Sequence, residues 1–513
     1  MEYHIEIDSM SLEPTTLWEI ARSAMNPHSR LRIDLTRKAR HVIDEARTTL
    51  EFLIGRNSMM YGINTGVGSL YNEHLSSSDV EEFQRNLLRS HSCGVGHPLS
   101  RDLVMGMWLV TLNSIAKGHR GIRPVTCSHI ISILEAGILG VVPSRGSVGA
   151  SGDLAPCAHA ALVLIGEGWC TMPQTDCFVK LPSRTALETV GLVPFELAAK
   201  EGLSLMNGTQ LSTVLALKVW NEASRLVSIA NLAAAMSMVG MQSSLGIIYE
   251  PLLEAHQHPG TLHAGRDISC WLGTSPQSLD PPSIGKRLQD PYSIRCCPQV
   301  HGAVWEEIES SENILCAEIN ASTDNPLLFP VEGTLCHGGN FHAIYPGRVS
   351  DRLASALTVL ASISERRINI ALNAASSGLP SFLTKNGGLN CGLMMVHPTA
   401  AALVAECRSL CFPATVDSIP TNCDQEDHVS MAPNAGFKAL KIVENLRYIL
   451  AIELLVATQA MDLVKGIAVP EKLVRVREKI RAVCPFVAQD RVLSDNIEDI
   501  TELIRQEVFW SLR

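Results

Sequence analysis

Long helices with apolar residues on more than one face dominate the hydrophobic pattern of the chain. Over residues 350–373, apolar side chains recur at steps of three and four without a Gly or Pro, and 438–465 repeat this pattern for about eight turns. Shorter stretches at 102–117 and 300–320 follow the same period. Because helices of this kind need several helical neighbours, we predict a mainly α protein built on a long-helix bundle. Strand signals are few and short, for example at 177–181.

Glycine and proline gather in short segments between these helices, at 61–68, 94–98, 143–152, 338–339 and 386–392. Tight glycine-rich loops beside helix starts often carry function. Loop-rich sequence gives way to long helices near residue 210, and charge density rises after Pro470. We therefore expect an N-terminal loop-rich domain at 1–210, a central long-helix bundle at 211–470 and a C-terminal helical segment at 471–513.

One uncharged stretch, at 226–248, is long enough to span a bilayer. It is rich in Ala, Ser, Gly and Met, contains Asn231 and Gln242, and is flanked by Arg225 and Glu250. This composition favours a helix that is buried on all sides within the bundle, so we expect no membrane partner.

Composition and charge exclude several classes of protein. Of the 513 residues, 46% are hydrophobic and 18% are charged, which rules out a disordered chain. The net charge of −10, without any basic block, argues against nucleic acid as a partner. The first residues are polar and acidic, unlike a secretory signal, so we expect a cytoplasmic protein whose fifteen cysteines are reduced.

The most informative segment is the loop GSVGASGDLAP at 146–156. Asp153 can cap a helix that runs on through 159–168, and Pro156 suits the first turn of that helix. Ala150 and Gly152 lack bulky side chains, so the Gly152 N–H can approach the Ala150 carbonyl, and Ser151 can then lose its hydroxyl. Cyclisation with dehydration gives an imidazolinone with an exocyclic methylene, an electrophile that no side chain supplies. Two alternatives are a plain glycine-rich helix entry and a hydrolase nucleophile at Ser151, although the G-x-S-x-G pattern is absent.

GSVGASGDLAP resembles the prosthetic-group loop of the aromatic amino acid ammonia-lyase family, and eight further segments agree with that family in order and spacing. The likeness runs from about residue 50 to about residue 465, and within the family it is greatest to the histidine lyases. The matching segments are YGINTGVG (61–68), QRNLLRSHSCGVGHPL (84–99), KEGLSLMNGTQ (200–210), QDPYSIRCCPQVHG (289–302), TDNPLLF (323–329), GGNFHA (338–343), SERRI (364–368) and QEDHVSMAP (425–433).

The resemblance implies an ammonia-lyase fold, a homotetramer and active sites that combine residues from more than one subunit. The implied reaction is the non-oxidative elimination of ammonia from L-histidine to give trans-urocanate, the first step of histidine degradation. The implied electrophile is 4-methylidene-imidazol-5-one, formed autocatalytically from Ala150, Ser151 and Gly152, without a metal. Such a group is needed because the Cβ–H bond is barely acidic and the amine leaves poorly. No nucleotide cofactor is expected, since the chain has neither a Walker loop nor a G-x-G-x-x-G after a strand.

The resemblance places two further residues in the catalytic machinery. Tyr61 matches the base of the family, and as a phenolate it would need nearby donors and helix dipoles to lower its pKa. Glu426 matches an acidic residue near the substrate amine and imidazole. Without the resemblance, Tyr61 would be interpreted as a packed loop tyrosine, and Glu426 equally as a carboxylate at a helix start.

Six residues match positions that contact the substrate or the prosthetic group in the family. Arg295 matches the residue that grips the substrate carboxylate, for which a bidentate guanidinium is suited. His91, preceded by Ser90, resembles the Ser-His pair of the histidine lyases, whereas tyrosine and phenylalanine lyases tend to carry His-Leu and Phe-Leu. An apolar pocket would leave the imidazole nitrogens unpaired at a cost of about 1–3 kcal/mol each. The remaining matches are Asn207, Gln289, Tyr292 and Phe341.

Four positions depart from the family pattern: Val67 replaces Phe, Cys157 replaces Leu, Cys407 replaces Asn and Phe412 replaces His. By its position, Cys157 could tune access to the electrophile, and Phe412 bears on the identity of the substrate. A tyrosine or phenylalanine lyase, or an aminomutase, therefore stays open, although Ser90 and His91 argue against it.

A catalytically silent relative that serves as a scaffold or regulatory subunit is a second alternative, against which the intact Ala150-Ser151-Gly152, Tyr61 and Arg295 argue. The histidines of HQHPGTLH, His256, His258 and His263, resemble a metal motif only superficially. Pro259 and Gly260 separate them and no carboxylate or thiol cluster completes a ligand set, so we predict a mobile loop and no metal site.

Overall fold

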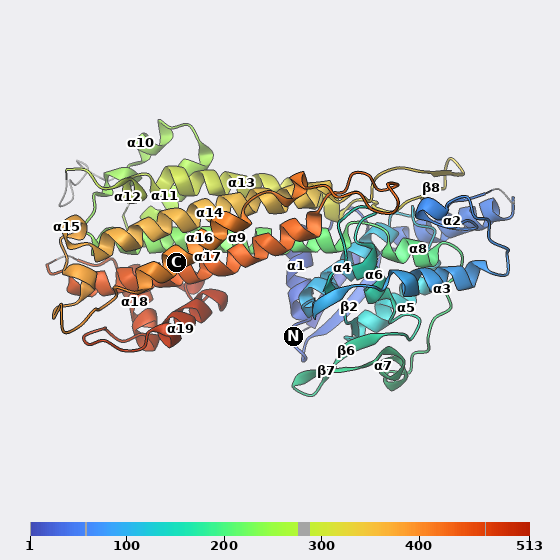
Figure 1. Cartoon of the computed structure of the whole chain (residues 1–513), viewed down its shortest axis with the longest axis horizontal. Helices are drawn as coiled ribbons and strands as arrows, with labels where there is room; N and C mark the ends of the chain where they lie inside the picture. Colours follow the sequence, from blue (N-terminus) through green and yellow to red (C-terminus); the bar gives the residue numbers. More distant parts are fainter. Residues whose placement is uncertain (1, 57–58, 275–287, 467) are drawn as a thin grey trace. The chain divides into compact units, whose positions relative to one another are not determined.

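Long helices carry much of the chain in the computed structural model, which describes residues 2–56, 59–274, 288–466 and 468–513 (Figure 1). The longest are α9 (Gln210–Gly240), α13 (Cys297–Ile319), α14 (Ile344–Leu372) and α17 (Ala432–Leu463). The last three coincide with the periodic stretches of the sequence, and α4 (Arg101–Ile115) coincides with the fourth. The prediction of a mainly α protein built on long helices is confirmed.

The chain divides into two compact units that are discontinuous in sequence. Unit 1 comprises residues 1–218, 312–350 and 413–437, and unit 2 comprises residues 219–311, 351–412 and 438–513. Most of the boundaries fall inside the four longest helices, because each of these helices runs from one unit into the other. The division into consecutive segments 1–210, 211–470 and 471–513 stays a prediction.

Unit 1 combines short helices with small sheets. The strands β1 (Glu2–Ile7) and β2 (Arg30–Leu35) pair in parallel. The other sheets are antiparallel: β3 (Val95–Pro98) pairs with β5 (Pro143–Arg145), and β8 (Leu327–Phe329) pairs with β9 (Thr334–Cys336). A three-stranded sheet has the order β4 (Leu139–Gly140), β6 (Trp169–Gln174), β7 (Cys177–Pro182). β7 confirms the strand expected at 177–181. The remaining helices of unit 1 are α1 (Pro14–Ser23), α2 (Arg37–Ile54), η1 (Gly68–Leu70), α3 (Val80–His91), α5 (Pro124–Glu135), α6 (Leu154–Ala161), α7 (Ser183–Thr189), α8 (Glu201–Met206) and η4 (Ala414–Val416).

Unit 2 is a helical bundle whose long helices are joined by a buried polar network. Glu453 of α17 accepts hydrogen bonds from Ser237 of α9 (3.0 Å) and from Arg367 of α14 (2.9 Å), and Arg367 also contacts His301 of α13 (3.3 Å). The shorter helices of this unit are η2 (Leu245–Ile248), α10 (Glu250–Glu254), α11 (Pro259–Leu272), α12 (Tyr292–Arg295), α15 (Ala374–Ser377), η3 (Ser381–Leu383), α16 (Val396–Leu410), α18 (Glu471–Val483), α19 (Ser494–Arg505) and η5 (Trp510–Leu512).

The helix α9 accounts for the uncharged stretch of the sequence. It is long and apolar enough to cross a membrane by length and composition, but 78% of its apolar window is buried inside the protein, as in a core helix. It ends at Gly240, earlier than the pattern predicts, because Gln242 adopts a left-handed backbone and 245–248 form only a 3₁₀ turn. A side chain at Gly240 would press on Ala460, so glycine permits close packing of α9 against α17.

Candidate active site

The loop that carries Ala150, Ser151 and Gly152 depends on glycine at two positions. Gly149 and Gly152 have φ values of +67° and +74°, in the region that favours glycine. A Cβ on Gly152 would overlap the carbonyl group of Gly208, which precedes α9. The main chains therefore meet at a distance that no side chain allows.

Neighbouring segments of unit 1 hold this loop on two sides. The N–H of Asp153 donates to the carbonyl oxygen of Gly208 (2.7 Å), and the N–H of Met431 donates to that of Val148 (2.8 Å). Ala150 and Gly152 are buried, whereas Ser151 is partly exposed. The loop thus presents Ser151 from a firmly anchored backbone.

Asp153 stands at the start of α6 but does not cap it, contrary to the sequence-based prediction. Its carboxylate accepts hydrogen bonds from the N–H (2.7 Å) and hydroxyl (3.0 Å) of Ser212, in the first turn of α9, and from the Ser147 hydroxyl (2.9 Å). Burial raises the pKa of Asp153 to about 6, against the lowering effect of these bonds. Asp153 therefore ties the loop to α9, where the N-terminal dipole favours a carboxylate. Pro156 lies in the first turn of α6 as expected, but α6 ends at Ala161 and does not continue to 168.

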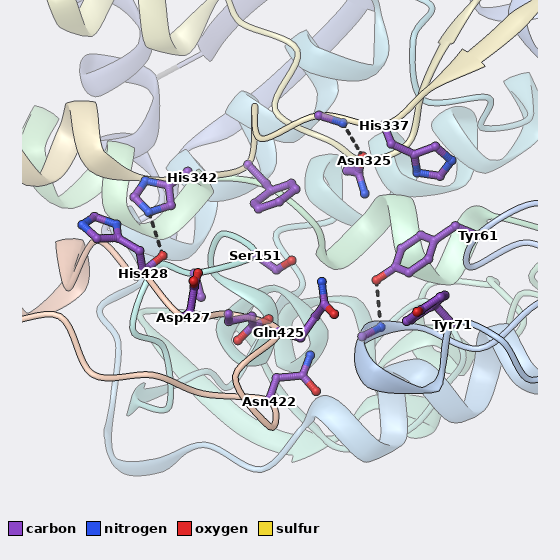
Figure 2. A pocket seen from close by; sticks show the side chains of 15 residues that line it. Tyr61, Tyr71, Ser151, Asn325, His337, His342, Asn422, Gln425, Asp427 and His428 are labelled. Atoms are coloured by element: carbon purple, nitrogen blue, oxygen red, sulfur yellow. Dashed lines mark hydrogen bonds between the residues drawn. The ribbon is translucent and has the colours of Figure 1, made fainter.

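Ser151 opens onto two adjoining cavities of about 470 and 350 Å³, which we call the large and small lobes of the Ser151 cavity. Figure 2 shows side chains that line the large lobe. Both lobes lie within unit 1. The residues that line both are Tyr61, Gly68, Ser151, Asn422 and Glu426. Of the other candidates, Ala150 and Phe341 line the large lobe, and His91 and Asn207 line the small lobe.

Tyr61 faces the cavity with its hydroxyl held by the main chain (Figure 2). The N–H of Gly68 donates to the Tyr61 oxygen (2.8 Å), and the ring of His337 meets the Tyr61 ring edge to face at 5.9 Å between centroids. Burial raises the pKa of Tyr61, the Gly68 N–H lowers it and the charge of Glu426 raises it further. The structure thus supplies one of the donors expected from the sequence, but the net direction is upward.

His91, at the C-terminal end of α3, is fixed in one tautomer by its neighbours. Its Nδ1 lies 2.9 Å from the carbonyl oxygen of Leu87, which can only accept, so Nδ1 carries the proton. Burial lowers the pKa of His91 and so favours the neutral ring. The Leu87 contact and the charge of Glu426 act in the opposite direction. The neutral ring leaves Nε2 as an acceptor. His91 therefore offers the small lobe an acceptor suited to an N–H group.

Asn207 and Glu426 contribute polar groups to the same space. The Asn207 amide nitrogen donates to the carbonyl oxygen of Asn325 (3.1 Å), while its buried Oδ1 has no hydrogen-bond partner among the residues that the structure describes. Glu426 accepts a hydrogen bond from the Thr421 hydroxyl (2.6 Å) in a turn closed by a bridge between the same two residues. Because α17 begins only at Ala432, the alternative of a carboxylate at a helix start is wrong.

Three candidate residues belong to unit 2, whereas the residues that line the Ser151 cavity belong to unit 1. These three are Gln289, Tyr292 and Arg295. Gln289 is exposed, Tyr292 is 71% exposed, and the guanidinium of Arg295 lies 4.8 Å from the centroid of the Tyr292 ring. Among the described residues that line the Ser151 cavity there is no Lys or Arg.

Several cavity residues were not singled out from the sequence. Asn325, Gln425, Asp427 and His428 lie inside the matched segments, so those segments carried the signal without assigning a role. Tyr71 and His337 had no such signal. Asn422, Cys423 and Asp424 all have left-handed backbones, with φ between 53° and 64°, which is uncommon for residues other than glycine.

The four departures from the family pattern have different environments. Cys157 is buried in α6, where its thiol donates to Gln210 (3.4 Å) and burial raises its pKa well above the ordinary value. Cys157 is not among the residues that line the Ser151 cavity, and the hypothesis that it tunes access to the electrophile stays a prediction. Val67 lines the small lobe, Cys407 is buried in unit 2, and Phe412 is 66% exposed there.

The three histidines near residue 260 do not share a loop. Pro259 begins α11, as proline often does at the first position of a helix, and His263 lies within α11 with its ring stacked on Trp305 at 4.3 Å. The predicted loop is therefore wrong for His263. Across the described parts of the chain, no group of three or more His, Cys, Asp or Glu side chains is arranged to hold a metal ion, and all fifteen cysteines are free thiols.

Comparison with known proteins places the chain in a family. The family model for aromatic amino acid lyase matches residues 12–482, which is most of the chain. The chain belongs to the aromatic amino acid lyase family. It is therefore an enzyme of the lyase class.

Relatives and solved structures resemble this lyase over nearly its whole length. A histidine ammonia-lyase of Anaeromyxobacter sp. (strain K) is 42% identical over 488 residues, which cover 94% of each chain. The crystal structure of histidine ammonia-lyase from Trypanosoma cruzi superposes with a TM-score of 0.90 at 36% identity, covering 99% of this chain and 95% of that one. A tyrosine aminomutase from Streptomyces globisporus superposes with a TM-score of 0.91 at 30% identity, covering 99% and 98% of the two chains.

Proposed function

We propose that this lyase is a histidine ammonia-lyase, which eliminates ammonia from L-histidine to give trans-urocanate. The observation that carries the proposal is the position of His91 in the small lobe, in the same cavity as Ser151 and Tyr61. Its neutral ring offers Nε2 as an acceptor for an imidazole N–H. Relatives that carry this name, at about 40% identity, support the same substrate.

The prosthetic group of the proposal is 4-methylidene-imidazol-5-one, made from Ala150, Ser151 and Gly152 with the loss of two waters. The residues present fit it, because the left-handed Gly152 packs where no side chain is possible and the buried Asn207 Oδ1 has no other partner in the described parts of the chain. When present, this group supplies an electrophile that captures the substrate amine and makes it a better leaving group. The proposal includes no metal and no nucleotide.

Tyr61 is the proposed base, with its phenolate oxygen taking a proton from the substrate Cβ. The Gly68 N–H stabilises the phenolate oxygen, and the partial burial of the ring keeps water from it. Glu426, which lines both lobes, is the proposed partner of the substrate amine or imidazole. Phe341 is proposed to line the substrate pocket.

The substrate carboxylate needs a cationic partner, and the described lining of the Ser151 cavity contains neither Lys nor Arg. We therefore propose that the active enzyme is a homotetramer in which Arg295 of one subunit binds the carboxylate in the cavity of another. Gln289 and Tyr292, which belong to the same stretch of unit 2, would enter that cavity with it. A bidentate guanidinium–carboxylate pair would fix the orientation of the substrate as well as neutralise its charge.

The test is near-UV absorbance of the purified protein during incubation with L-histidine, L-tyrosine and L-phenylalanine in parallel. We expect urocanate from histidine alone, no product from Ser151→Ala, and full activity from the control Ser132→Ala, which alters an exposed serine of α5. Coumarate or cinnamate in place of urocanate would contradict the proposed substrate. A β-amino acid product would indicate an aminomutase, and no product at all would indicate a silent relative.

A further inference from the structure

Behind the Ser151 loop, unit 1 buries a guanidinium that the proposed chemistry does not use. Arg120 follows α4 and is 0% exposed, and its Nε donates to the Ser114 hydroxyl (2.9 Å). Burial lowers the pKa of Arg120, against the raising effect of the Asp324 charge. Within the described residues, no carboxylate lies at ion-pair distance from Arg120, because Asp324 pairs with Lys200 instead (2.6 Å).

The Arg120 guanidinium donates hydrogen bonds to main-chain carbonyl groups. Its Nη1 donates to the carbonyl oxygens of Ser204 and of Asn207 (3.1 Å for the latter), and its Nη2 lies 3.4 Å from the Thr323 hydroxyl. Ser204 lies in α8, and Asn207 begins the short turn between α8 and α9. A buried cation in this arrangement fixes two adjacent pieces of backbone at once.

That turn forms the wall against which the Ser151 loop packs. Asn207 lines the small lobe, and the next carbonyl, of Gly208, accepts the N–H of Asp153 (2.7 Å). A Cβ on Gly208 would lie 3.1 Å from Arg120 Nη2, so the turn is held directly between the guanidinium and the loop. A shift of Arg120 would therefore move Asn207 and the support of Gly152 together.

We propose that Arg120 is a positioning residue for the lyase reaction, which sets the Asn207 amide and the Gly208 carbonyl against the Ala150-Ser151-Gly152 loop. The inference rests on the proposed function, since it concerns the placement of groups that the reaction uses. Lysine could not replace Arg120, because a single ammonium cannot reproduce the planar fork that spans two carbonyls and a hydroxyl.

The chain offers a matched control in Arg101, at the start of α4. Its side chain is partly buried and likewise donates to carbonyl oxygens, those of Ala24 (2.9 Å), Thr171 (3.1 Å) and Gly137 (2.8 Å), but it does not line the Ser151 cavity. Arg101→Lys therefore reports the structural cost of losing such a fork without a change at the turn 207–209.

The experiment compares the parent, Arg120→Lys and Arg101→Lys by three readouts. These are the mass of the proteolytic peptide that contains residue 151, the steady-state kinetics with L-histidine, and the midpoint of thermal unfolding. For Arg120→Lys we expect a smaller fraction of peptide lacking two waters. For the fraction of the variant in which the prosthetic group has formed, which we call the matured fraction, we expect kcat to fall about 100-fold with little change in KM, as for a small misplacement of groups near the reacting atoms. For Arg101→Lys we expect full maturation and parental kcat, with a comparable fall in the unfolding midpoint.

Parental maturation and kcat in Arg120→Lys would overturn the positioning role while leaving the proposed function intact. Equal losses in the two variants at equal unfolding midpoints would also overturn it, since the effect would then be one of stability. If the parent itself neither loses two waters nor forms urocanate, the proposed function fails, and the positioning role with it.

Discussion

The buried ion pair beside Arg120 allows a quantitative prediction of stability. Lys200 Nζ lies 2.6 Å from Asp324 Oδ2 and both side chains are 0% exposed, with the Ser204 hydroxyl 2.9 Å from the same oxygen. Asp324→Asn removes the only charge that pairs with the ammonium among the described residues. Because an unpaired charge would then stay buried, we expect a loss of about 3–5 kcal/mol in the free energy of unfolding. This is a large part of the roughly 5–15 kcal/mol that stabilises an ordinary domain.

The assay is urea unfolding followed by circular dichroism at one fixed protein concentration, because assembly of subunits would add a concentration-dependent term. Two controls separate burial from charge. The double variant Lys200→Met/Asp324→Leu removes both charges and should lose far less than Asp324→Asn alone. Glu167→Gln breaks the partly exposed pair with Arg89 (2.6 Å) and should cost no more than about 1 kcal/mol.

The pH dependence of Asp324→Asn has a definite sign. Burial already lowers the pKa of Lys200, and the charge of Asp324 opposes that lowering, so the variant lowers the pKa further. Between this lowered pKa and the ordinary value of 10.5, the unfolded chain binds more protons than the folded one, so stability should rise with pH. A loss below about 1 kcal/mol, as for an exposed pair, or a loss that does not shrink as pH rises, would refute the interpretation of Lys200 as a buried, charged partner.

Three further predictions concern the active site. His91→Leu should lower kcat/KM for L-histidine by about 10–100-fold, because it removes one hydrogen bond to the imidazole; steady-state kinetics of the parent and the variant with L-histidine check this. Tyr61→Phe should keep the two-water mass loss but lower kcat by about 10²–10⁴-fold. Because the pKa of Tyr61 is raised, parental kcat/KM should climb with pH in the alkaline range, and a pH profile of the Phe variant should lack that climb. Gly152→Ala should block the mass loss, since a Cβ there overlaps Gly208, whereas Gly191→Ala, at the same φ of +74° but with open space around it, should leave the mass loss unchanged.

The sequence predicts the long helices well because their period is sustained and their ends matter little. Three of the longest, α13, α14 and α17, begin and end within six residues of the predicted stretches. The sequence does not predict which of several possible hydrogen-bond partners a single side chain binds. Asp153 sits at a helix start in the sequence, yet its carboxylate binds Ser212, 59 residues further along the chain, and no local pattern encodes such a contact.

The candidate site divides in the same way. The glycines of the Ser151 loop could be predicted to permit close approach, because glycine alone tolerates the left-handed backbone found there. The direction of the Tyr61 pKa could not be predicted, since it depends on burial and on Glu426, which is 365 positions away in sequence. Arg120 was equally hidden: its importance lies in the carbonyls that it binds, and carbonyls carry no sequence signal.

Two features of the Ser151 cavity point to the same requirement. The described lining contains carboxylates but no Lys or Arg, and the charge of Glu426 raises the pKa of the tyrosine proposed as base. A zwitterionic substrate would bring a further carboxylate into this negative environment, which would make a phenolate still harder to form. A guanidinium that enters from another subunit would bind the substrate carboxylate. Its positive charge would also favour the anionic form of Tyr61. Under the proposed tetramer, assembly is therefore a condition of the chemistry.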